Sequence, residues 1–111
     1  GHFITLGSVN GATTRFLVDT GASFVAFSGA EARRLGIDYL KGERGIMATA
    51  NGSVAAYRIT LNSVKVGDIS LNQVQASVSE APMGVSLLGM SFLNRVEMKR
   101  DGSTMTLTKK Y

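Results

Sequence analysis

Residues 16–24 read FLVDTGASF and place one carboxylate, Asp19, at the end of an apolar run. Three consecutive apolar residues are typical of a strand that is covered on both faces. A carboxylate at the end of such a strand is costly to bury unless it is hydrogen-bonded, paired or protonated. Thr20 and Ser23 supply hydroxyls, and Gly21 allows a sharp turn whose backbone N–H groups can point at the carboxylate. The segment therefore predicts a stabilised carboxylate on a tight loop.

The composition limits the chemistry that can accompany Asp19. The 111 residues suit a single domain spanning 1–111. There is no cysteine, which excludes disulfides, thiolate catalysis and cysteine-based zinc sites. The one histidine is His2, and a frayed chain end cannot hold a catalytic base in register. Hydrolytic chemistry would therefore have to rest on carboxylates.

The charges argue against a nucleic-acid partner. The net charge is +4, and the twelve basic residues are scattered along the chain. Nucleic-acid binding favours a clustered basic stripe with aromatic residues between the charges. No apolar stretch approaches the roughly 20 residues of a membrane-spanning helix. We therefore expect no nucleic-acid partner and no membrane span within this sequence.

The hydrophobic pattern predicts an all-β domain with one or two short helices. Ser28 and Glu31 fit a capping box at the start of one helix, and Gly36 fits its left-handed C-cap. A second short helix is predicted for Met90–Arg95. The predicted strands are 3–9, 12–18, 23–27, 44–50, 53–61, 64–67, 69–78, 85–88, 96–100 and 103–108.

Two turn features add detail to this pattern. Asn10-Gly11 and Asn51-Gly52 are typical of two-residue hairpin turns, and we expect a type I′ turn at Asn51-Gly52. The apolar residues occupy alternate positions, but this alternation shifts by one residue at Asn62-Ser63 and again near Gln73. A change of parity moves side chains to the other face of a strand, so we expect a bend or bulge at these points.

A single carboxylate side chain cannot easily catalyse the hydrolysis of a peptide bond. An efficient arrangement uses two carboxylates that share a proton, one activating water and the other donating to the substrate carbonyl. Among the other acidic residues, Glu31 belongs to a cap, Asp68 and Asp101 lie in turns, and the rest lack a comparable setting. A two-fold axis beside Asp19 would supply the second carboxylate from another copy of the chain.

The segment Leu17-Val18-Asp19-Thr20-Gly21-Ala22-Ser23 resembles the active-site loop of retropepsin-like aspartic proteases. The second hallmark of that family, two apolar residues and a glycine before a short helix, resembles Leu87-Leu88-Gly89-Met90-Ser91-Phe92-Leu93. The resemblance covers nearly the whole chain and is greatest to the bacterial single-domain branch. It implies a dimeric acid-protease barrel without metal or organic cofactor.

The resemblance also implies roles for individual residues. Asp19 would be catalytic, supported by Thr20 across the dimer axis, by Gly21, and by Ser23 as a hydroxyl near the carboxylate. Leu87, Leu88 and Gly89 would pack behind this loop. A flap formed by the hairpin 44–58 would cover an extended peptide substrate, and its tip would comprise Thr49, Ala50, Asn51 and Gly52.

The sequence departs from the viral members at two positions. Those enzymes usually carry an acid where Ser23 stands and an arginine where Met90 stands, and the two charges pair near the dimer interface. Both charges are absent here, so neither is left unpaired. The flap also lacks the glycine-rich tip of the viral enzymes.

Two other functions remain open from the sequence alone. The chain could be a non-catalytic peptide-binding or dimerisation module on the same fold, or an assembly domain that presents edge strands to partners. Asp19 would then be a structural carboxylate that caps its own loop. By resemblance only, we expect a periplasmic or membrane-tethered setting, with any membrane anchor N-terminal to this sequence.

Overall fold

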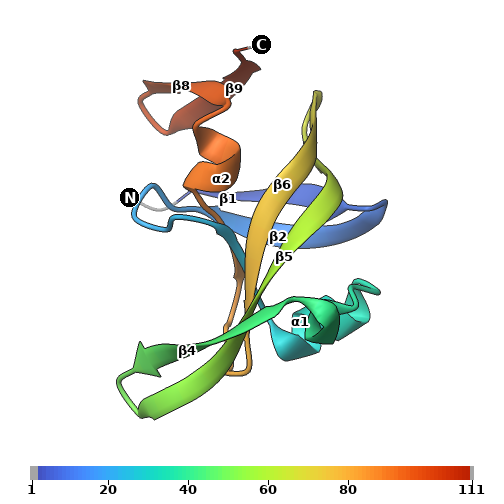
Figure 1. Cartoon of the computed structure of the whole chain (residues 1–111). Helices are drawn as coiled ribbons and strands as arrows, with labels where there is room; N and C mark the ends of the chain where they lie inside the picture. Colours follow the sequence, from blue (N-terminus) through green and yellow to red (C-terminus); the bar gives the residue numbers. More distant parts are fainter. Residues whose placement is uncertain (1–2, 111) are drawn as a thin grey trace.

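The computed structural model describes residues 3–110, the side chains of Thr49 and Arg100 excepted, so His2 lies outside the described residues. This part of the chain is built mostly of strands with three short helical segments (Figure 1). The strands are β1 (Ile4–Val9), β2 (Ala12–Val18), β3 (Val25–Ser28), β4 (Glu43–Thr49), β5 (Gly52–Val66), β6 (Ile69–Ser79), β7 (Ser86–Leu88), β8 (Val96–Asp101) and β9 (Thr104–Lys109). The helices are α1 (Gly29–Arg34), the 3₁₀ helix η1 (Tyr39–Lys41) and α2 (Met90–Leu93).

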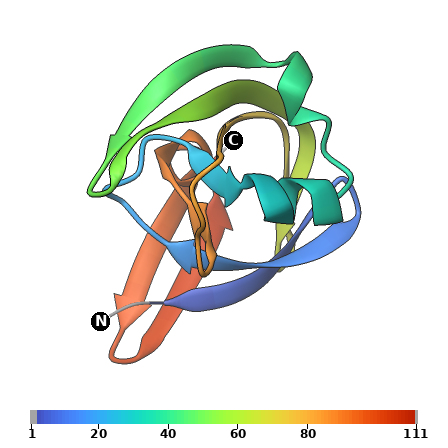
Figure 2. The same cartoon turned by 90° about the horizontal axis from the view of Figure 1, so that it is seen from below.

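Six strands close into a barrel, which confirms the predicted all-β fold with short helices. The sheet order is β1-β2-β7-β3-β6-β5-β4, and an additional pairing joins β1 to β5. Figure 2 shows the ring of strands from below. β4 pairs only with β5 in the described part, so this hairpin extends from the barrel (Figure 1).

The apolar residues of the alternating pattern fill the interior of the barrel. Phe16 of β2 and Phe27 of β3 are fully buried, and their ring centroids lie 6.0 Å apart. Fully burying a side chain of this size stabilises a fold by about 1.5–3 kcal/mol. The largest fully buried side chains are Val9, Phe16, Val25, Phe27, Leu61, Val64, Val74, Val78, Leu88, Phe92 and Leu93.

Helix α1 begins and ends at the predicted caps. The Ser28 hydroxyl accepts a hydrogen bond from the Glu31 N–H at 3.1 Å. Gly36 has a left-handed φ of 75°, and its N–H donates to the Arg33 carbonyl at 3.1 Å. The next N–H, of Ile37, donates to the Ala32 carbonyl at 2.8 Å, which completes a Schellman motif. The second helix, α2, is shorter than predicted and ends at Leu93.

β5 runs without a break through Asn62 and Ser63, so the prediction of two separate strands there was wrong. The predicted change of face is confirmed, because Leu61 and Val64 are both buried although they are three residues apart. β6 changes face at the opposite position, where Gln73 has a left-handed φ of 54°. The pairing register is the same on both sides of this point, so both strands turn over together without a one-sided bulge.

The two asparagine–glycine turns differ in conformation. Asn10 and Gly11 have φ values of 50° and 90°, as a type I′ turn requires. The type I′ turn predicted at Asn51-Gly52 was wrong, because Thr49 pairs with Gly52 and the turn consists of Ala50 and Asn51. Neither of these two described residues has a positive φ, whereas Gly52 has a φ of 118°. A glycine with positive φ after the turn is typical of a hairpin with a glycine bulge.

The last two strands form a sheet of their own. β8 pairs with β9 from Val96 to Asp101, and neither strand pairs with the barrel in the described residues. Both strands lie next to α2, at the opposite end of the molecule from the β4–β5 hairpin (Figure 1). The strands were predicted, but their separation from the barrel was not.

Candidate functional site

Asp19 lies on a tight loop directly after β2, as predicted. Its N–H donates to the Leu88 carbonyl at 3.1 Å, and its own carbonyl accepts from the Ala22 N–H at 3.2 Å. The Gly21 N–H donates to Oδ1 of the carboxylate at 2.9 Å. Asp19 itself is half-buried. The loop therefore holds one carboxylate oxygen by a backbone N–H and leaves the side chain partly accessible.

The two sequence hallmarks meet behind this loop. β7 runs parallel to β2, with Leu17 opposite Leu87 and Val18 opposite Leu88. Leu88 is fully buried, whereas Leu87 is half-buried. A parallel pair requires the chain to return from a distant segment, which is why a separation of many residues in the sequence becomes a direct contact.

Gly89 joins the loop to the start of α2. A β-carbon at this position would lie 2.8 Å from the Ala22 carbonyl oxygen and closer still to the carbonyl of Phe24. The Met90 N–H donates to the Ala22 carbonyl at 2.8 Å, and the Ser91 N–H donates to the Ser23 carbonyl at 2.9 Å. Because these carbonyls bond to α2, β3 begins at Val25, two residues later than predicted.

Ser91 is a supporting residue for which we predicted no role. Its hydroxyl accepts from the Val25 N–H at 2.9 Å and donates to the Gln75 carbonyl at 2.7 Å. One side chain thus connects α2, β3 and β6. A serine inside the otherwise apolar segment Met90-Ser91-Phe92-Leu93 is the signal that could have revealed it, since a polar group among buried residues needs partners.

The other predicted supporting residues are exposed within one chain. Thr20 and Ser23 both have exposed side chains, and Ser23 contacts its surroundings through its backbone carbonyl. No described hydrogen bond joins the Ser23 hydroxyl to Asp19, so its role beside the carboxylate stays a prediction. The role of Thr20 across a dimer axis also stays a prediction.

The β4–β5 hairpin extends from the barrel with an exposed surface. Ile46 is 71% exposed and Met47 is 37% exposed. Ala50, Asn51 and Gly52 at the tip are exposed as well, whereas the side chain of Thr49 lies outside the described residues. The hairpin is therefore not packed into the core of its own barrel, and its surface remains accessible.

A row of directly paired residues, called the register row below, crosses the sheet from the strand that precedes the Asp19 loop to this hairpin. The successive pairings are Leu17–Leu87, Leu87–Ala26, Ala26–Ser77, Ser77–Arg58 and Arg58–Glu43. Directly paired residues project from the same face of a sheet. The first four side chains of the row are half-buried, whereas Arg58 and Glu43 are exposed. The row is therefore a surface on the face opposite the core.

The shorter of the two ion pairs in the described residues joins Glu31 and Arg34 of α1 and lies outside the Asp19 loop. Glu31 accepts hydrogen bonds from Arg34 at 2.7 Å and from Thr14 at 2.6 Å. The hydrogen bond with Arg34 is the main cause that lowers the pKa of Glu31 from 4.5 to about 2, against the opposing effect of burial. A hollow of about 500 Å³ adjoins this pair, and neither Asp19 nor the rest of its loop lines it.

The described residues offer no candidate metal centre. No group of three or more histidine, cysteine, aspartate or glutamate side chains in the described part is arranged to hold a metal ion. None of the helices in that part is long and apolar enough to cross a membrane. Asp19 is thus the residue around which the candidate site is built.

Comparison with known proteins agrees with this geometry. The model of the gag-polyprotein putative aspartyl protease family matches residues 5–95. The crystal structure of a retropepsin-like aspartic protease from Rickettsia conorii is 39% identical, with a TM-score of 0.79, and the match covers 91% of this chain and 85% of that one. EIAV protease in complex with an inhibitor is 22% identical, with a TM-score of 0.63 over 85% and 86% of the two chains. That second likeness shows the fold alone.

Two curated bacterial proteins are also similar. An uncharacterized protein of Rickettsia prowazekii (strain Madrid E) is 41% identical over 97 residues, which are 86% of this chain and 41% of the relative. An uncharacterized protein encoded in the cobV 5′ region of Sinorhizobium sp. is 37% identical over 100 residues, or 88% of this chain and 43% of the relative. The chain spans less than half the length of these relatives. From the matched residues and the fold together, the chain belongs to the retropepsin-like aspartic protease family.

Proposed function

We propose that the chain is one subunit of a homodimeric aspartic endopeptidase in which Asp19 is the catalytic residue. The observation that carries this proposal is the Asp19 loop itself. A half-buried carboxylate is held by the Gly21 N–H, and the loop is fixed from behind by hydrogen bonds to Met90 and Ser91. A rigid support of this kind is what a reacting group requires.

The second carboxylate comes from a second copy of the chain. The Asp19 loop contains no other acidic residue, and the only acidic residue of the register row is Glu43 at its far end. A two-fold axis beside the loop brings the two Asp19 side chains together, and Thr20 then lies where its hydroxyl can contact the partner loop. The site is therefore incomplete in one chain.

The two carboxylates divide the chemical work. One is ionised and accepts a proton from the attacking water, while the other is protonated and donates to the carbonyl oxygen of the substrate. The water oxygen forms the new bond to the carbonyl carbon, and the C–N bond then breaks as the amine takes a proton. No covalent acyl-enzyme forms, and no metal is needed to activate the water.

The substrate is an extended peptide that lies across the register row. The β4–β5 hairpin acts as a flap that covers the peptide and excludes water, with Ala50, Asn51 and Gly52 at its tip. Backbone pairing with an extended chain supplies affinity, and alternate side chains supply specificity. The half-buried Leu17, Leu87 and Ala26 offer an apolar surface for such side chains.

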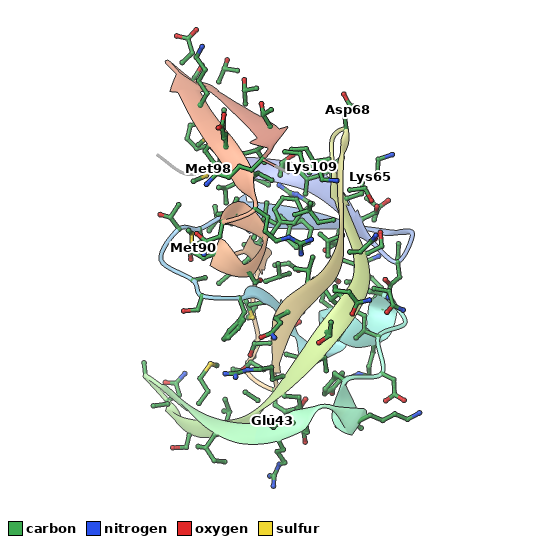
Figure 3. The ribbon with its side chains drawn as sticks, turned by 45° about the horizontal axis from the view of Figure 1, so that its top comes forward. Glu43, Lys65, Asp68, Met90, Met98 and Lys109 are labelled. Carbon is green, nitrogen blue, oxygen red and sulfur yellow. The ribbon has the colours of Figure 1, made fainter. Side chains whose placement is uncertain are left out.

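The decisive experiment is cleavage by the wild type and by Asp19→Asn. A peptide library at mildly acidic pH should be cut by the wild type and left intact by the variant, because the amide has nearly the shape of the carboxyl but cannot replace it chemically. Asp68→Asn is the matched control, since it makes the same change at an exposed position in the β5–β6 turn, outside the Asp19 loop (Figure 3).

Dimerisation and folding of each variant are measured in parallel. Undiminished cleavage by Asp19→Asn would remove Asp19 from the mechanism. A wild type that binds peptides but cuts none would favour the alternative, a peptide-binding module on the same fold.

A further inference from the structure

A cation is anchored on the surface that leads away from Asp19. The guanidinium carbon of Arg58 lies 4.6 Å from the ring centroid of Phe24, which is a cation–π contact. Phe24 is half-buried, and its carbonyl closely approaches Gly89 behind the Asp19 loop. The stack therefore links the position of the Arg58 side chain to the same rigid support as the catalytic loop.

The register row shows where this cation stands. Leu17 and Leu87 lie at the Asp19 end, and Ala26 and Ser77 follow toward β5. All four are half-buried on the face opposite the core. Arg58 comes next and is exposed. The surface thus changes from apolar beside the reacting carboxylate to cationic at its outer part.

The charge of Arg58 is not neutralised by a close carboxylate in the described part of the chain. The ion pairs there are Glu31–Arg34 and Asp38–Lys41, and neither includes Arg58. Glu43 is the register neighbour of Arg58 on β4, and it is exposed. A guanidinium that is stacked on one face keeps its in-plane N–H donors available to a ligand carboxylate.

We propose that Arg58 is a specificity-determining residue, which binds an aspartate or glutamate side chain of the substrate peptide. This inference rests on the proposed peptidase function and adds a preference to it. Asp19 follows β2, and the sheet order places β5 four strand spacings from β2, roughly 19 Å. The acidic side chain therefore lies several residues from the scissile bond, at a position that the peptide library identifies.

The test compares paired peptides within each enzyme. Cleavage-site profiling on a peptide library first identifies the position at which acidic residues are enriched. Peptides that differ only by Glu or Gln at that position then give a ratio of kcat/KM. We expect a ratio of roughly 5 to 20 for the wild type, below about 2 for Arg58→Gln, and below 1 for Arg58→Glu.

Two further variants separate the charge of Arg58 from its stacking on Phe24, and a third is a control. Arg58→Lys should retain part of the preference, because it keeps the charge without the planar fork. Phe24→Leu should lower the ratio by releasing the guanidinium. Lys65→Gln removes a cation near the C-terminal end of β5, beside the β5–β6 turn (Figure 3), and should leave the ratio of the wild type unchanged.

The outcomes distinguish a failure of the Arg58 site from a failure of the proposed peptidase function. Equal ratios in the wild type and Arg58→Gln would overturn the role of Arg58 while leaving the peptidase intact. If the wild type cuts no peptide, the proposed function fails, and the same library is used as an array for binding. An acidic preference in binding that Arg58→Gln loses would then support the Arg58 site, and its absence would overturn the site.

Discussion

Gly89 passes so close to Ala22 that a β-carbon at position 89 would lie 2.8 Å from the Ala22 carbonyl oxygen. The atoms it would meet belong to the backbone, so no side chain can move aside to make room. This contact is where the second hallmark segment supports the Asp19 loop, because the Met90 N–H bonds to the same carbonyl. The glycine is therefore a packing requirement of the site.

We predict that Gly89→Ala destabilises the fold by about 3 kcal/mol, since overpacking against backbone forces the loop and α2 apart. Gly84→Ala is the control, because a β-carbon there would meet no atom within 4 Å. Denaturant unfolding of both variants checks the prediction. Equal stability of the two would mean that the loop relaxes without cost.

Ser91→Ala should cost about 1–3 kcal/mol, because it leaves the N–H of Val25 without its acceptor in the core. The Gln75 carbonyl loses its donor as well. Ser70→Ala, on an exposed position of β6, should change stability by less than about 0.5 kcal/mol. Thermal unfolding measures both. A Ser91→Ala variant as stable as Ser70→Ala would show that water or a shifted backbone satisfies these groups.

Much of the fold could be predicted because local rules decide it. The cap residues Ser28 and Gly36 delimit α1 through hydrogen bonds and a left-handed φ that act within a few residues. The parity change at Asn62 and Gln73 is visible because burial follows the alternation of a strand. Asp19 stands out because a carboxylate rarely ends an apolar strand.

The remainder depends on contacts that no local pattern contains. β5 stays continuous through Asn62 because β6 turns over opposite it. The tip at Ala50 and Asn51 follows from the register with which β4 pairs. The stack of Arg58 on Phe24 requires knowing that β3 and β5 both pair with β6. These features are set by pairing across the sheet rather than by sequence neighbours.

The pKa of Glu31, lowered to about 2, predicts how stability depends on acid. The ionised carboxylate is stabilised in the fold, so its contribution is present above about pH 4.5 and is lost as the pH falls toward 2. Glu31→Gln should lower stability by about 1–2 kcal/mol at neutral pH and flatten the dependence in that window. Unfolding at several pH values in both proteins tests this. An unchanged slope in the variant would assign the acid sensitivity to other groups.

Cleavage should be fastest at mildly acidic pH and should decline on the alkaline side. In the proposed dimer, two Asp19 carboxylates about 3 Å apart would share one proton, and turnover would stop once that proton leaves. A pH profile of kcat/KM with a single peptide is the measurement. Activity that keeps rising into the alkaline range would argue against a shared proton.

Mixing active and inactive subunits tests whether two chains form one site. If each chain supplies one carboxylate, as proposed, a heterodimer of wild type and Asp19→Asn should be inactive. In an equal mixture at exchange equilibrium, roughly a quarter of the dimers contain two wild-type chains. These dimers hold roughly half of all wild-type chains, so the activity per wild-type chain falls to roughly half. A tenfold excess of the variant should lower it to roughly one tenth.

Subunit exchange must be demonstrated in the same samples, by native mass spectrometry of chains that differ in tag length. Dilution of the wild type alone should also lower the specific activity, in parallel with the monomer fraction. The Asp68→Asn chain provides the matched mixing control, because its heterodimers keep both Asp19 carboxylates and should stay fully active. If activity per wild-type chain is constant while exchange with Asp19→Asn is complete, one Asp19 suffices and the shared site is wrong.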